Sequence, residues 1–157
     1  MRSLVHERDR ADLERRLSAL TPDRSRRWGR MTAPQMVCHL TDSFRGVLGE
    51  RTDPGAPQPP PAPFIGRTVV KWAALYLPLP WPHGTPTAPS ADQERGGTPP
   101  TEFARDMASL REVSDRFRRQ LAVVAKRPHF FFGPLTEAEW ARWGYRHMDH
   151  HLRQFGL

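Results

Sequence analysis

The residues of this 157-residue chain best suited to chemistry are three histidines. His147 and His151 are four positions apart, so on a helix their imidazoles lie one turn apart on one face. Two imidazoles at this spacing can share one cation, as in helical zinc sites. His39 is the best candidate for a third ligand, because it is expected in mid-helix beside an apolar stripe, where an unpartnered imidazole is costly. The pattern predicts a three-histidine divalent-metal site with one open position, the layout of a catalytic centre.

Three further polar residues are candidates for supporting this site or its pocket. Gln154 lies one turn beyond His151 and can hold a ligand or a bound water, or be an ordinary polar helix end. His150 falls at the edge of the buried face, where it either supports a ligand or meets solvent. His129, in a loop rich in Pro and Phe, is a pocket candidate. Spacing alone leaves an ordinary histidine pair as the alternative, since seven histidines give some such pairs by chance.

The elements that must position these residues are all helical, because apolar residues recur at helical spacing and no segment of useful length alternates as a strand does. The expected helices are residues 3–20, 32–49, 64–77, 101–126 and 136–155. Capping boxes mark the starts at Thr32 and Thr136, and Gly49 can end the second helix. The helix at 64–77 is apolar on most sides and is expected to be well buried. Long Pro-rich loops are expected at 51–63 and 77–100.

Size and composition indicate one soluble globular domain over residues 1–157, with 38% apolar and 26% charged residues. The single cysteine, Cys38, excludes an intramolecular disulfide framework and fits a reducing compartment. We find no signal-peptide pattern and no apolar run that spans a bilayer, so we expect a cytoplasmic protein without a membrane partner. Although the net charge is +7, basic and acidic residues are interleaved, which argues against nucleic-acid binding.

Several sequence blocks resemble one known family. The segment HMDHHLRQF, with His147, His151 and Gln154, resembles the last metal-binding helix of the DinB-like (DinB/YfiT) superfamily. WGRMTAPQMVCHLTDSF, with His39, resembles the earlier helix that supplies the third histidine there. Together with LPWPHGTPTAP and HFFFGPLTEAEWARWGY, these blocks are similar to a subfamily of unknown function and cover roughly half of the chain.

The resemblance implies a four-helix bundle in up-down-down-up order, often dimeric, whose three histidines hold nickel, zinc or a similar ion. It also implies a small-molecule substrate, because characterised relatives include transferases that join a low-molecular-weight thiol, bacillithiol or mycothiol, to electrophiles. Other relatives are a thiol-dependent isomerase and proteins described only as metal-dependent hydrolases. We therefore expect a metal-dependent thiol S-transferase or hydrolase acting on a small electrophile. The alternative is a non-catalytic metal-binding bundle that serves as an interaction or stress-response protein. Two departures stand out: the Pro-rich loops can reshape the pocket, and no Glu next to the ligands offers a general base.

Overall fold

The computed structural model describes residues 1–51, 64, 66–84 and 87–157, and within these ranges all regular elements are helices, without a β-strand. Four long helices carry the fold: α1 (Glu7–Ser18), α2 (Ala33–Leu48), α4 (Phe103–Arg119) and α6 (Glu137–Gln154). The short elements are the π-helical turn η1 (Gly66–Val70), α3 (Lys71–Tyr76), the 3-10 turn η2 (Pro89–Ala91) and α5 (Leu121–Val124). The all-α prediction is confirmed. No described helix has the length and apolar character needed to cross a membrane.

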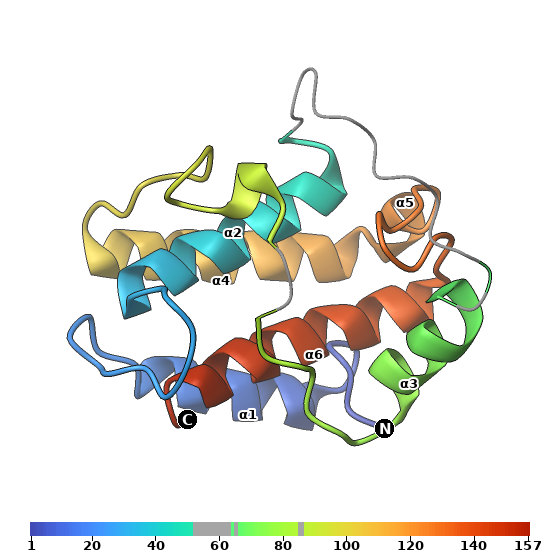
Figure 1. Cartoon of the computed structure of the whole chain (residues 1–157), viewed down its shortest axis with the longest axis horizontal. Coiled ribbons are helices and arrows are strands. Elements are labelled where there is room, and N and C mark those ends of the chain that lie inside the picture. Colours follow the sequence, from blue (N-terminus) through green and yellow to red (C-terminus); the bar gives the residue numbers. More distant parts are fainter. Residues whose placement is uncertain (52–63, 65, 85–86) are drawn as a thin grey trace.

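The four long helices form the expected bundle (Figure 1). Helix α1 lies along α6 and helix α2 lies along α4, with α2 and α6 meeting across the middle. Followed by colour in Figure 1, α1 and α6 run in one direction and α2 and α4 in the opposite one, which is the up-down-down-up order. This arrangement places the middle of α2 opposite the C-terminal half of α6.

An aromatic cluster joins three of the helices at the centre of the core. Phe44 of α2, Phe117 of α4 and Trp143 of α6 have ring centroids 5.0 to 5.9 Å apart. Phe44 and Phe117 are fully buried, and such aromatic pairs add to the free energy gained from burying apolar area. Because the cluster fixes α2 against α6, it also fixes the relative positions of side chains that the two helices present to each other.

The sequence signals for helix ends are confirmed where they bear on the site. The side chains of Thr32 and Thr136 each accept a hydrogen bond from the backbone N–H of the third residue of the helix. In return, the side chains of Gln35 and Glu139 accept from the backbone N–H of these two threonines. Gly49 ends α2 in a left-handed conformation, with φ of 79°, which glycine adopts without strain. These caps set where α2 and α6 begin, and therefore which of their residues face each other.

The predicted helix at residues 64–77 is partly wrong. It is divided into η1 and α3, and much of its apolar surface faces solvent, with Val69 61% and Trp72 54% exposed. Among the residues of this segment that the structure describes, only Leu75 is buried. Lys71 ties the segment to α6 through an ion pair with Glu139 at 3.0 Å. When a helix is apolar on most sides, its sequence does not indicate which face packs against the rest of the protein. Here the bundle covers only the face with Leu75.

Two other expectations about boundaries differ from the structure. The predicted helix at 101–126 breaks at Gln120, whose φ of −109° and ψ of 21° are not helical, and this break gives α4 and α5. The first helix is shorter than expected, because residues 3–6 form a turn instead of its first turn. The Pro-rich connector expected at 51–63 lies, apart from Arg51, outside the described residues.

A glycine on α6 tests how tightly the bundle is packed. A methyl group on Gly144 would lie 2.6 Å from Leu4 Cδ1 and 2.9 Å from Phe117 Cε1. We therefore expect Gly144→Ala to lower the free energy of unfolding by roughly 1 to 2 kcal/mol, despite the better helix propensity of alanine. In Gly46→Ala, where nothing lies within 4 Å, the same propensity should instead raise stability by up to about 1 kcal/mol. Urea denaturation of both variants measures the difference, and equal shifts would contradict this packing.

Candidate metal centre

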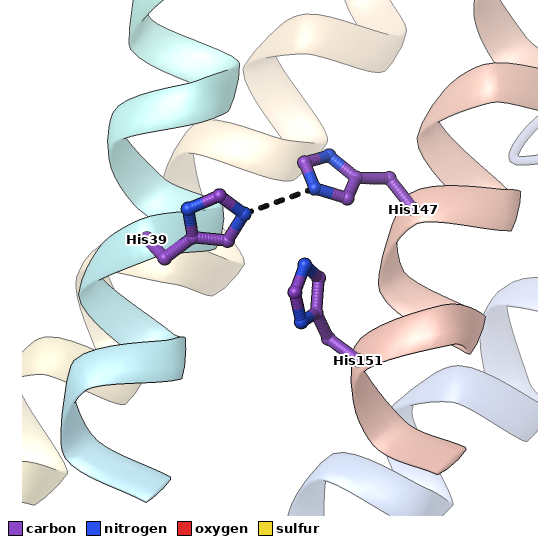
Figure 2. A group of neighbouring side chains, drawn as sticks. All are labelled: His39, His147 and His151. Atoms are coloured by element: carbon purple, nitrogen blue, oxygen red, sulfur yellow. Dashed lines mark hydrogen bonds between the residues drawn. The ribbon is translucent and has the colours of Figure 1, made fainter. Parts of the chain in front are cut away.

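The three histidines singled out by the sequence meet between α2 and α6 (Figure 2). His39 comes from α2, and His147 and His151 come from successive turns of α6. One ring nitrogen of each lies within 4.8 Å of those of the other two, and the Nε2 atoms of His39 and His147 are 3.1 Å apart. The described residues therefore contain a group of three imidazoles whose spacing suits a single metal ion.

Hydrogen bonds behind two of the rings fix which nitrogen faces the centre. His39 Nδ1 lies 2.8 Å from the carbonyl oxygen of Ala91, and His151 Nδ1 lies 2.9 Å from Oε1 of Gln154. Both oxygens only accept, so each Nδ1 must carry the proton and donate it. Gln154 is itself oriented, because its Nε2 donates to the carbonyl oxygen of Trp28 at 2.9 Å. As a result, His39 and His151 turn unprotonated Nε2 atoms toward the centre, the form in which imidazole binds a metal.

His147 differs from the other two rings. Its Nδ1 is buried and has no hydrogen-bond partner in the described part of the chain. Its Nε2 approaches the lone pair of His39 Nε2 at 3.1 Å, a separation that requires either a proton or a cation between the two atoms. A divalent ion placed there satisfies both lone pairs, so the donor set fits a metal that prefers neutral imidazole nitrogen.

Burial keeps these imidazoles neutral. Loss of hydration lowers the pKa of His39, and it lowers the pKa of His147 and His151 well below the usual histidine range. Repulsion between the imidazoles lowers the pKa of His147 and His151 further. All three rings are therefore uncharged at neutral pH, so metal binding need not remove the second ring proton of a charged imidazolium.

A buried carboxylate holds the loop that supports His39. Asp42, one turn after His39 on α2, accepts hydrogen bonds from Thr98 N at 2.7 Å and Thr98 Oγ1 at 2.8 Å. It also receives Arg51 Nη1 at 3.0 Å. These bonds anchor Thr98, at one end of the segment from Ala91 to Thr98. At the other end, the carbonyl of Ala91 orients the His39 ring. Our sequence reasoning missed Asp42, although an acid three residues after a predicted ligand on an apolar helix face is a usable signal.

Aromatic rings wall the site, and it is most open beside His147. Trp143 and Trp81 lie against His147, with ring centroids 5.1 and 6.1 Å away. His39 and His151 are only 5% and 7% exposed, whereas His147 is half-buried. His147 is therefore the most exposed of the three rings.

His150, predicted to support a ligand or meet solvent, lies next to the centre but outside the group of three. Its ring centroid is 5.1 Å from that of His151, and burial lowers its pKa to about 4. It lines a cavity of about 20 Å³ with Trp28, Trp81 and His83. Trp28 stacks on His83 there, with centroids 4.1 Å apart. The cavity has room for about one water molecule, so a substrate enters on this side only if these side chains move apart.

His129, predicted as a pocket residue, is buried on the other side of Trp143. Trp143 contacts both His129 and His147, with centroids 5.6 and 5.1 Å away. The Nδ1 atom of His129 accepts hydrogen bonds from the backbone N–H groups of Phe131 and Phe132, both at 3.1 Å. His129 thus supports the aromatic wall from behind, and any closer role in the pocket stays a prediction.

Comparison with known proteins identifies the family. The family model described as the DinB superfamily matches residues 6–155, nearly the whole chain. Neither a curated protein nor a solved structure matches the chain. The match covers every helix of the bundle, including all three histidines.

The loop anchor at Asp42 can be tested by mutation. We expect Asp42→Ala to lower the free energy of unfolding by about 2 to 4 kcal/mol, because it leaves the Thr98 N–H group without its acceptor and removes the ion pair with Arg51. The matched control is Asp115→Ala, which removes a carboxylate on the surface. That carboxylate forms ion pairs with Arg118 and Arg119. That variant should change stability by less than about 0.5 kcal/mol. Urea denaturation that ranks the two variants alike would contradict the anchoring role.

Proposed function

The chain belongs to the DinB superfamily, and from this membership and the site geometry we propose that it is a metal-dependent enzyme. His39, His147 and His151 hold one divalent ion, zinc or nickel, although three imidazoles also suit copper and iron. The reaction is transfer of a low-molecular-weight thiol to a small electrophilic substrate. The observation that supports this proposal is the convergence of three neutral imidazoles with no carboxylate in the group.

The chain's own residues have distinct tasks in this proposal. His39 and His151 are held rigidly by the Ala91 carbonyl and by Gln154, so their Nε2 atoms need no reorientation on binding. Trp143 beside the rings limits water around the site. A divalent ion with an open position would lower the pKa of a bound thiol or water toward neutrality. His147 is the least buried of the three rings, which favours approach of that exogenous group from its side.

The lack of a nearby free carboxylate favours thiol transfer over hydrolysis. Asp42 and Asp92 are the acids whose charge reaches His39. Asp42 is bonded to Thr98, and Asp92 is paired with Arg30 at 3.4 Å. Neither is placed as a base for a water molecule. A thiol ionises far more readily than water, so it needs less help from a base. The sulfur forms a bond to the electrophilic carbon while the leaving group departs with its electron pair, and the thiol proton passes to solvent.

A second candidate function is a non-catalytic one, in which the ion stabilises the bundle for an interaction or stress-response role. The observation that favours it is that the ligands come from two different helices, α2 and α6, and that His39 and His151 are buried. An ion bound there links the two halves of the bundle and stabilises the folded state by mass action.

Metal content tests the ligand set common to both functions. Purified protein should contain about one equivalent of divalent metal, and the His147→Ala/His151→Ala double variant should contain almost none. His6→Ala is the matched control, because His6 is exposed at the start of α1 and should leave the metal content unchanged. Elemental analysis gives the result directly. Full metal retention in the double variant would refute the assignment.

Turnover and melting of the same samples separate the two functions. With a low-molecular-weight thiol and chlorodinitrobenzene as electrophile, the metal-loaded protein should consume thiol. Chelation or the double substitution should reduce the rate at least about 100-fold. The stabilising role predicts no turnover with any thiol or electrophile, and a melting temperature lower by about 5 to 10 °C after chelation. Absence of turnover in protein fully loaded with metal would refute the enzyme proposal. An equal melting temperature with and without metal would exclude the stabilising role.

A further inference from the structure

A tight turn between α5 and α6 displays two phenylalanines to solvent. His129 and Gly133 close the turn with two backbone hydrogen bonds of 2.8 Å each. Phe130 and Phe131 at its tip are 58% and 43% exposed. The Nδ1 atom of His129 accepts hydrogen bonds from the N–H groups of Phe131 and Phe132, and the His129 carbonyl accepts from that of Gly133. The backbone donors of residues 131–133 are therefore all satisfied within the turn. This turn can enter an apolar environment without leaving those three donors unpaired.

A second exposed apolar segment lies at the same end of the bundle (Figure 1). It consists of η1 and the start of α3, where Val69 and Trp72 are more than half exposed. The two segments touch, because a methyl group on Gly133 would lie 3.6 Å from Cδ of Arg67. We call these two segments together, residues 66–72 and 129–133, the apolar end patch. Isolated apolar side chains on a surface need no explanation, but a group that includes Trp and two Phe marks an interaction site.

The sequence on either side of the apolar end patch is poor in acids. The two longest stretches of the chain without Asp or Glu are residues 54–91 and 116–136, and each contains one of the two exposed segments. Lys71 is neutralised by Glu139. Arg67, Lys126 and Arg127, in contrast, form no ion pair with any acid in the described part of the chain. Arg127 covers Gly49 at the end of α2, so Arg67 and Lys126 are the cations nearest the patch. They favour a partner with negative charge around an apolar interior.

We propose that the apolar end patch docks peripherally on an anionic lipid bilayer. Exposed Phe and Trp side chains beside unpaired Arg and Lys are the combination that an acidic headgroup region over an acyl interior recognises. A second copy of the chain fits less well, because symmetric pairing would bring the cations at Arg67 and Lys126 of both copies together. This proposal departs from the sequence expectation of no membrane partner. That expectation rested on the absence of a spanning segment, and docking on the surface needs none.

Vesicle co-sedimentation tests the proposal on the full-length protein. The protein should bind vesicles of phosphatidylcholine with phosphatidylglycerol, should bind phosphatidylcholine alone much more weakly, and should lose binding as salt screens the charges. Phe130→Ser/Phe131→Ser should reduce the partition coefficient by about tenfold or more. The control is Val5→Ser, which removes a comparably exposed apolar side chain, 51% exposed, outside the patch and should bind as the unchanged protein does.

Three results would overturn the proposal. The first is that the unchanged protein ignores anionic vesicles. The second is that the Phe130→Ser/Phe131→Ser variant, shown to be folded by its circular dichroism spectrum, binds as well as the unchanged protein. The third is that, without lipid, the unchanged protein sediments as a dimer and the double variant as a monomer, which assigns the patch to a second copy of the chain. None of these results depends on whether the three histidines bind metal.

Discussion

Burial of three neutral imidazoles between α2 and α6 is the constraint on which the site depends. A buried imidazole without partners costs free energy, and each of these rings has two nitrogens to satisfy. For His39 and His151 the outer nitrogen is satisfied by the Ala91 carbonyl and by Gln154, so only the inner nitrogens remain. Those inner atoms lie too close together to be left without a shared proton or cation. Without a metal, a proton on one of the two Nε2 atoms satisfies the contact between His39 and His147. One divalent ion bound by all three rings would replace that proton and also use the inner nitrogen of His151, so the arrangement fits a ligand set.

The loop after α3 helps to hold the buried imidazoles in place. Asp42 on α2 holds Thr98, and the same segment returns its Ala91 carbonyl to His39, so helix and loop fix each other. Trp81, earlier in the same connection, donates from its indole nitrogen to the Ala74 carbonyl at 2.8 Å and lies against His147. Trp81, in the loop that follows α3, thus also lines the metal centre.

The helices and their ends were predictable because the signals are local. Capping boxes at Thr32 and Thr136 and the glycine at Gly49 act over three or four residues, and the structure confirms all three. The segment at 64–77 was mispredicted for the converse reason. Its composition is apolar throughout, but burial depends on how much of it the bundle can cover, and only the face with Leu75 is covered. The break at Gln120 carries no comparable signal in the sequence.

The sequence by itself determined the all-helical class and the pairing of His147 with His151, because helical periodicity fixes which residues share a face. It also singled out His39 as the candidate third ligand, from its place beside an apolar stripe and from the family resemblance. Only the tertiary structure decided that the three rings meet, that Nε2 is the inward atom of His39 and His151, and that Asp42 anchors the supporting loop. Contacts such as Ala91 to His39 join residues far apart in the chain. Their existence depends on how the helices pack and where the loops return, which no local pattern encodes.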